Sequence, residues 1–194
     1  MRTEASLSKR AVRLLGIAES SPLTATIAVL AGVVMRADLI IDGMASETVH
    51  IGGMDASDAV IALVHRLGRE DIGGILLHGS VIAGYNVIDL RYVHDATRLP
   101  VMSVSQEPQS DLRAILQDKF PTDWQSRWHL VEQNGHPHSL RLPTNNTVFL
   151  QCHGTRTDTA SRLVKRLTRF GGIPEPLRVA RLFARALAIP PSTR

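Results

Sequence analysis

The stretch ILLHGSVIAGYNVIDL, residues 75–90, decides how the middle of the chain folds. Three branched apolar residues, 75–77, are typical of a buried strand, and they lead directly into His78 and Gly79. A second glycine, Gly84, follows, and glycine adopts turn conformations that other residues disfavour. The stretch therefore predicts a buried strand that ends at a cleft, with an ionisable side chain and two glycines lining it.

The segments on either side predict a mixed sheet. Strands are predicted over 12–17, 26–35, 38–51, 73–77, 100–105, 138–142 and 146–153. Apolar residues spaced three and four apart predict helices over 55–67, 86–97, 111–120, 122–133, 156–170 and 174–187. The short connection between the second and third strands predicts a hairpin, whereas strands separated by helices pair in parallel. The expected fold class is α/β, with an antiparallel start, then parallel strands, and helices on both faces. The ribonuclease H-like architecture has this form, although the pattern also allows other α/β folds with a leading hairpin.

Composition indicates one soluble domain. With 194 residues, 44% of them hydrophobic, the chain is long enough for a single sizeable core. We expect a flexible tail over 1–11 and a single domain over 12–190. No apolar run approaches the roughly 20 residues that a membrane span needs, so no membrane partner is expected. Cys152 is the single cysteine, which excludes an internal disulfide and favours a reducing cytoplasm.

The charge of the chain is unevenly distributed. Residues 156–194 carry nine basic groups against Asp158 and Glu175, while the chain as a whole has a formal net charge of only +4. A basic C-terminal part on a mildly acidic body indicates an anionic partner, and nucleic acid is the usual one. A solvated, arginine-rich helix face would give the same pattern.

Several motifs, in order, resemble one family. PEPLRVARLFARAL (174–187) looks like a C-terminal signature, and GGMDASDAV (52–60) looks like an Asp-Ala-Thr-Asp/Glu helix start with Ser57 for the threonine. HGSVIAGYNVIDL (78–90) and LPVMSV (99–104) are similar to a turn and to the strand that follows it. On these motifs the chain resembles, from about residue 12 to 188, the mainly archaeal endonuclease dU family, formerly DUF99 or UPF0215.

The resemblance implies a fold like endonuclease V, hence ribonuclease H-like, and cleavage of DNA that contains deoxyuridine. It also implies acidic residues after the first strand and at the end of the later strand, holding a divalent metal. The chain departs from that pattern at both places: GIAES (16–20) leaves only Glu19, and His78 stands where an aspartate is expected.

Carboxylates near strand ends are the candidate metal ligands, because divalent metal chemistry on phosphodiesters needs converging oxygen ligands. Glu19 directly follows the first strand, and an exposed turn acid is the alternative. Asp42 lies in LIIDG, at a strand bend or on a half-exposed strand. Asp55 and Asp58 have the spacing of a helix-capping pair, or they border the cleft with one acid facing metal or DNA.

The turn after the middle strand supplies the other candidates. His78 is a structural residue, a metal ligand or a proton shuttle. Gly79 and Gly84 let the backbone approach a ligand, and Tyr85 stacks on a base or packs in the core. Asn86 is expected to cap the next helix, with Asp89 as its acid one turn in.

Three arginines of the last predicted helix, Arg178, Arg181 and Arg185, are spaced three and four apart and share one face. Facing a cleft they would hold phosphates, whereas facing water they would only add solubility. Glu175, in the first turn, suits the positive end of the helix or pairs with an arginine.

These observations favour a DNA endonuclease that uses Mg²⁺ or Mn²⁺, with Glu19, His78 and Asp55 as catalytic residues and Glu19, Asp42 and Asp58 as metal ligands. The DNA contacts would come from Gly79, Gly84, Tyr85, Asn86 and the three arginines. The alternative is a nucleic-acid-binding relative that has lost its metal acids and does not cleave. A third hypothesis is a small-molecule enzyme or oligomer scaffold with the same fold.

Overall fold

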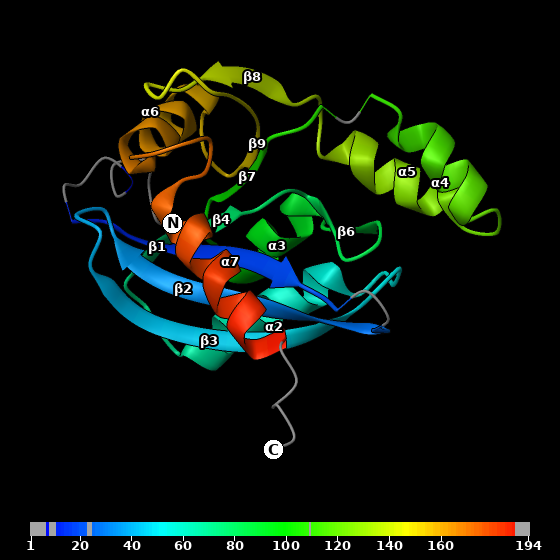
Figure 1. Ribbon diagram of the computed structural model, residues 1–194, viewed down its shortest axis with the longest axis horizontal. Helices are drawn as coiled ribbons and strands as arrows, with labels where there is room; N and C mark the ends of the chain where they lie inside the picture. The colour runs from blue at the N-terminus through cyan, green and yellow to red at the C-terminus, as the bar shows by residue number, and fades with distance from the viewer. Residues whose placement is uncertain (1–6, 8–10, 23–24, 109, 189–194) are drawn as a thin grey trace.

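The computed structural model describes residues 7, 11–22, 25–108 and 110–188. Its centre is a seven-stranded sheet with the strand order β3-β2-β1-β4-β7-β9-β8 (Figure 1). The strands of this sheet are β1 (Arg13–Ser20), β2 (Ile27–Arg36), β3 (Ile41–His50), β4 (Ile72–Leu77), β7 (Val101–Ser105), β8 (His138–Arg141) and β9 (Thr147–His153). Most of the predicted tail lies outside the described residues.

The sheet is mixed, as the sequence predicts. β1, β2 and β3 pair antiparallel, and β4 then pairs in parallel with both β1 and β7. β9 returns antiparallel to β7 and pairs with β8. The carboxyl ends of β1, β4 and β7 consequently meet at one edge of the sheet. β2 and β4 lie on opposite sides of β1, so the order of the strands reverses direction between β1 and β4. In open α/β sheets this is the usual position of a ligand site.

Helices cover both faces, which confirms the predicted fold class. They are α2 (Ala56–Leu67), α3 (Leu90–Thr97), α4 (Leu112–Lys119), α5 (Trp124–Gln133), α6 (Thr157–Leu167) and α7 (Glu175–Ala188). Side chains of α2 and α3 pack with Leu15, Ile17 and Leu77 in one core. Side chains of α6 and α7 pack with Leu14 and Leu76 in another. The helices α4 and α5 form an arm that projects from the body (Figure 1).

Gly16 allows α7 to lie directly on the sheet. A Cβ atom at residue 16 would lie 2.5 Å from the carbonyl carbon and oxygen of Pro176, in the first turn of α7. No side chain fits in that space, because real Cβ contacts do not come so close. This close approach fixes the helix against β1 and thereby sets the position of Arg181, five residues after Pro176 on the same helix.

The predicted helix over 86–97 is too long at its start. Asn86 and Val87 form a short strand, β6 (Asn86–Val87), which pairs with β5 (Val81–Ile82) in a small second sheet. The helix α3 begins at Leu90, and its N-cap is Asp89, whose side chain accepts a hydrogen bond from Tyr92. The side chain of Asn86 instead accepts the N–H of Ala56 at the start of α2. The prediction that Asn86 caps the following helix is therefore wrong.

Side chains bond to the outward-facing backbone of β3, the outermost strand on its side. The amide of Thr48 donates to the carboxylate of Glu47, and the amide of His50 donates to Asp55. The carbonyl of His50 accepts a hydrogen bond from Asn86 at 3.0 Å. At the other end of the strand, Arg69 donates to the carbonyl of Asp42.

Candidate active site

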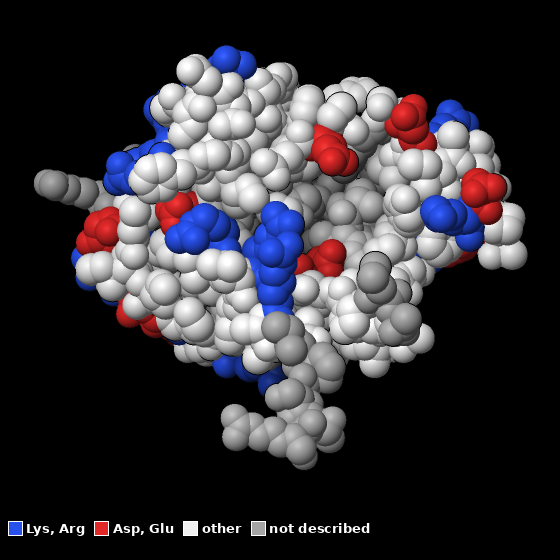
Figure 2. Space-filling view, viewed as in Figure 1, with Lys and Arg blue, Asp and Glu red and all other residues white. Residues whose placement is uncertain are grey.

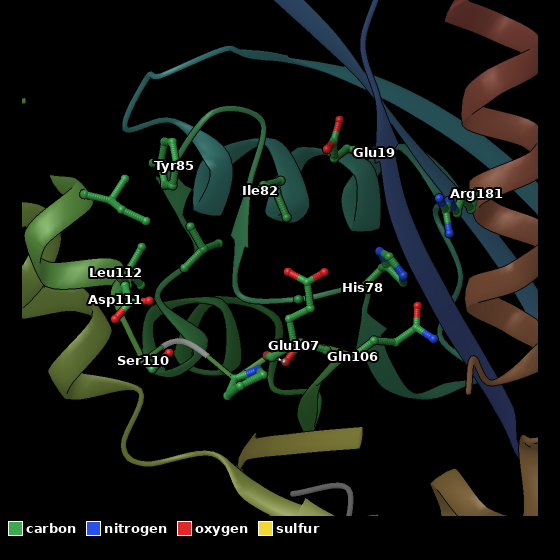
Figure 3. A pocket seen from close by; sticks show the side chains of 15 residues that line it. Glu19, His78, Ile82, Tyr85, Gln106, Glu107, Ser110, Asp111, Leu112 and Arg181 are labelled. Carbon is green, nitrogen blue, oxygen red and sulfur yellow. Dashed lines mark hydrogen bonds between the residues drawn. The ribbon is translucent and has the colours of Figure 1, made fainter. Parts of the chain in front are cut away.

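A pocket of about 610 Å³ lies where β1, β4 and β7 end. Its volume is in the range that accommodates a nucleotide-sized group. Figure 2 shows the hollow between the body and the arm, with basic side chains beside it over α7. The pocket is lined by Glu19, His78, Gly79, Val81, Ile82, Tyr85, Ser105, Gln106, Glu107, Pro108, Ser110, Asp111, Leu112, Ile115 and Arg181, most of which are labelled in Figure 3.

Glu19 reaches the pocket from the end of β1. Its Oε2 atom is buried and has no hydrogen-bond partner among the described residues. Burial raises the pKa of this carboxyl above its ordinary value, against the opposing effects of the Ala83 N–H group and the charge of Arg181. A buried polar atom without a partner is uncommon in native proteins and indicates a strained, functional or ligand-binding position.

His78 enters the same pocket from the residue after β4. Its backbone N–H donates to the carbonyl of Ile17 at 2.9 Å, which extends the ladder between β4 and β1. Its Nε2 atom is also buried without a partner in the described part of the chain. Burial lowers the pKa of the imidazole, and the charge of Arg181 lowers it further, so the neutral ring is favoured.

Arg181 is the cationic group of the pocket, contributed by α7. Its charge acts on both Glu19 and His78. No carboxylate in the described ranges lies within ion-pair distance of Arg181, whereas Arg178, on the same helix, pairs with Glu175 at 2.7 Å. Of the three predicted DNA-binding arginines, only Arg181 lines the pocket. Its guanidinium is available to bind an anion such as a phosphate.

The wall opposite these polar groups carries apolar side chains next to Ser110 and Asp111. Ile82 and Tyr85 come from the β5–β6 hairpin, and Leu112 and Ile115 come from α4 of the arm (Figure 3). The pocket thus places an aromatic ring and aliphatic side chains on one side and a carboxylate, an imidazole and a guanidinium on the other. That combination suits a ligand with a flat apolar part and an anionic part, as a nucleotide has.

Three predicted acids lie outside the pocket lining. The Asp42 carboxylate pairs with Arg13 and Arg69, and the hydrogen bond from Arg13 holds its pKa below the ordinary range. Asp58 is exposed on α2 and accepts a hydrogen bond from the Tyr92 hydroxyl. The structure does not bring either residue close to Glu19 in one site.

Asp55 is at the N-cap position of α2, but its side chain makes no capping bond. Burial raises the pKa of its carboxyl, but the hydrogen bonds from His50 and Asn86 outweigh this effect, so the net shift is downward. Asn86 is fully buried, and neither Asn86 nor Gly84 is among the residues that line the pocket. Gly79 and Tyr85, for which the sequence predicts DNA contacts, do line the pocket.

Five polar residues that were not predicted as site residues also line the pocket: Ser105, Gln106, Glu107, Ser110 and Asp111. Gln106 and Glu107 directly follow β7, and the Glu107 side chain points into the pocket (Figure 3). The rule that selected Glu19 and His78, which is that side chains at the carboxyl ends of parallel strands converge, also applies to them. Within the described residues, no three His, Cys, Asp or Glu side chains are grouped closely enough to hold a metal ion.

The family model for endonuclease dU matches residues 10–188. The chain belongs to the endonuclease dU family. A UPF0215 protein of Methanothermobacter thermautotrophicus is 30% identical, over 93% of this chain and 90% of the relative. The UPF0215 protein TK2033 of Thermococcus kodakarensis is 34% identical, over 96% of this chain and 97% of the relative.

Several solved structures share the fold of this endonuclease dU family member. The crystal structure of an Archaeoglobus fulgidus protein of unknown function superposes with a TM-score of 0.78 at 28% identity, covering 90% of this chain and 97% of that one. Human endonuclease V gives a TM-score of 0.66 at 19% identity, covering 96% and 90%. Endonuclease V of Ciona intestinalis, in complex with an inosine-containing DNA, gives 0.60 at 14%, covering 92% and 86%. The fold is therefore endonuclease V-like, as predicted. None of the helices in the described ranges is both long and apolar enough for a membrane span.

Proposed function

We propose that this protein is an endonuclease that cleaves DNA containing deoxyuridine, with the pocket at the ends of β1, β4 and β7 as its active site. The observation that carries the proposal is that Glu19 and His78 both line the pocket, and each has a buried polar atom without a hydrogen-bond partner in the described residues. Arg181 lines the same pocket and has no ion-pair partner in the described ranges. Membership in the endonuclease dU family supports the substrate.

Each wall of the pocket has a role in this proposal. Arg181 binds a phosphate of the DNA backbone, because a guanidinium matches the geometry of phosphate oxygens. Tyr85 stacks on the base, which an aromatic ring does without requiring a particular sequence. A base that pairs weakly leaves the duplex stack at a lower energetic cost, which favours a damaged or mismatched position.

A divalent cation fits this donor set if the DNA supplies several of its ligands. Mg²⁺ is often bound by one or two protein carboxylates together with substrate phosphates and water, and Mn²⁺ also accepts imidazole nitrogen. Glu19 and His78 are the residues that would hold it, through the two unpartnered atoms. When bound, such an ion supplies Lewis-acid stabilisation of the charge that develops on the phosphate.

Incubation of the protein with end-labelled duplexes tests the proposal. One duplex carries a single deoxyuridine and a matched duplex carries thymidine, each with Mg²⁺, Mn²⁺ or a chelator. We expect cleavage of the deoxyuridine strand only with metal, and Glu19→Gln should lower the rate by at least about 100-fold, as for loss of a group that acts on the reacting phosphate. Asp95→Asn, on the exposed face of α3, is the matched control. Cleavage by Glu19→Gln at the normal rate would remove Glu19 from the mechanism.

A second function, binding of nucleic acid without cleavage, is favoured by two departures from the acids that the family resemblance predicts. Ala18 and His78 occupy the positions where the family resemblance predicts aspartates, and no three-donor group is present in the described residues. This function predicts no cleavage in any divalent metal but salt-sensitive binding. Arg181→Gln should remove one phosphate contact and thereby reduce the slope of log affinity against log salt by about one. Arg141→Gln, on β8, should leave that slope unchanged.

A further inference from the structure

The turn at one wall of the pocket has an unusual backbone. Ala83, Gly84 and Tyr85 have φ angles of 39°, 67° and 73°, so three consecutive residues, two of them not glycine, have left-handed φ values. Residues with side chains persist in that region only where the surrounding structure holds them there. The turn carries Tyr85, which lines the pocket, and the Ala83 N–H group, which acts to lower the pKa of the Glu19 carboxyl.

Two neighbouring segments hold the turn in place. The amide of Gly52 donates to the carbonyl of Ala83 at 2.8 Å. The Nη1 group of Arg127, from α5 of the arm, donates to the carbonyl of Tyr85 at 3.1 Å and to that of Gly53 at 2.8 Å. Its Nη2 group donates to the carbonyl of Gly52, also at 2.8 Å. One guanidinium thus joins the arm, the loop before α2 and the strained turn.

Arg127 is itself fixed on the arm. Its side chain is only 4% exposed, and its Nε atom donates to Asp123 at 2.9 Å. The guanidinium lies 3.8 Å over the ring of Phe120, and that ring meets the Tyr85 ring edge-on with centroids 6.3 Å apart. A buried arginine with all its donors directed at fixed acceptors is costly to form and rigid once formed.

We propose that Arg127 is a positioning residue of the pocket: it holds the 83–85 turn so that the Tyr85 ring and the Ala83 N–H group face the bound base and Glu19. Arg127 does not line the pocket and acts through the turn. The inference rests on the proposed function, since it assigns the turn to recognition of a nucleobase. The competing role is purely structural, in which Arg127 only attaches α5 to the body.

Hydrogen exchange distinguishes the two roles without any ligand. Arg127→Lys keeps the charge but loses the fork that reaches three carbonyls. We expect exchange of the Gly52 and Ala83 amides to accelerate about tenfold or more, because local protection depends on the bonds that close the turn. Arg113→Lys is the matched control: Arg113 is another arginine of the arm, stacked on Trp124 and Trp128, and it does not line the pocket. Faster exchange within α5 alone, with the turn unchanged, would overturn the proposal.

Asp123→Asn covers the case in which Arg127→Lys does not fold. This variant keeps Arg127 and removes the carboxylate that orients it, so the same two amides should exchange severalfold faster. Unchanged exchange at both amides in Asp123→Asn would also count against the proposal.

A double-mutant cycle with Tyr85→Leu tests how the effect reaches the ligand. The probe is a single-stranded oligonucleotide with one deoxyuridine. We expect Arg127→Lys and Tyr85→Leu each to weaken oligonucleotide binding about tenfold. The double variant should bind about as tightly as either single variant, because the effects of coupled residues are not additive. Additive losses would show that Arg127 does not act through Tyr85. If the unmodified protein binds no nucleic acid, the proposed function fails, while the exchange experiment still decides the role of Arg127.

Discussion

Glu19 and His78 reach one pocket from opposite faces of the same pair of strands. Ile17 pairs with Leu77 across β1 and β4, and successive side chains of a strand point to alternate faces. Glu19 therefore points to the face of Ile17, which α2 and α3 cover. His78 points to the face covered by α6 and α7, and its neighbour on that face is Ala18. A carboxylate that shares a face with residue 78 would have to stand at residue 18.

The double variant Ala18→Asp, His78→Asp should gain metal binding. The two new carboxylates would share one face of the β1–β4 pair, and residue 78 lines the pocket together with Arg181 and Glu19. Hard divalent cations prefer such oxygen ligands. We expect calorimetric titration with Mn²⁺ to show tighter binding than in the unmodified protein, and the melting temperature to rise with Mn²⁺ concentration. The control is Ala18→Asn, His78→Asn. Equal Mn²⁺ affinity in both variants would contradict the prediction.

The free energy of unfolding of Glu19→Gln should increase relative to that of the unmodified protein as the pH rises. The pKa of Glu19 is raised by burial, so the folded state binds the proton more tightly than the unfolded state does. That contribution to stability is complete below the unfolded pKa of about 4.5 and is lost as the pH rises through the folded pKa. Glutamine does not titrate. Urea unfolding between about pH 4 and pH 7 should show a difference that grows with pH, and exposed Glu70→Gln should not.

His78→Asn should reduce the sensitivity of the fold to mild acid. Burial lowers the pKa of His78 below 6.5, so the unfolded state takes up the proton first. The neutral imidazole contributes stability above the unfolded pKa, and this is lost as the pH falls through the folded pKa. Melting temperatures from about pH 7.5 to pH 5 should fall less steeply in the variant. His136→Asn, at an exposed position, should follow the unmodified protein.

Gly16→Ala should destabilise the fold, because its methyl group would meet the backbone of Pro176 at 2.5 Å. Backbone cannot rotate away as a side chain does, so α7 has to shift. We expect a loss of about 1–3 kcal/mol in the free energy of unfolding. Gly43→Ala is a matched control on β3, where the nearest atom to a new Cβ would be 3.5 Å away. Equal losses in urea unfolding of the two variants would show that the contact with Pro176 does not decide the result.

Strands and helices followed from the sequence where their apolar pattern was continuous. The strand run 26–35 differs from β2 by one residue at each end, and the helix 55–67 differs from α2 by one residue at its start. The helix predicted from residue 86 failed because Asn86 serves another element: its amide is bound to His50, Asp55 and Ala56, which are about 30 residues away in the chain. A capping preference describes a residue type and cannot show which helix start the side chain will reach.

The site was predictable only in part. Glu19 lies at the end of β1 and His78 directly follows β4. Both were found because the convergence of parallel strand ends is a general property of such sheets. Asp42 follows no parallel strand end: it lies near the opposite edge, where Arg13 and Arg69 pair with it. Arg127 could not have been found, because its role depends on the distance between α5 and two loops. Nothing in local spacing records that distance.

The outward-facing backbone groups of β3 have a consequence for the behaviour of the protein at high concentration. An outermost strand with free amides and carbonyls is a template for a strand from another molecule. Here Glu47, Asp55, Asn86 and Arg69 already occupy such groups toward the two ends of the strand. A second molecule would have to displace these side chains before it could add its own strand. The polar side chains that are bound to the backbone of β3 therefore oppose aggregation at this edge of the sheet.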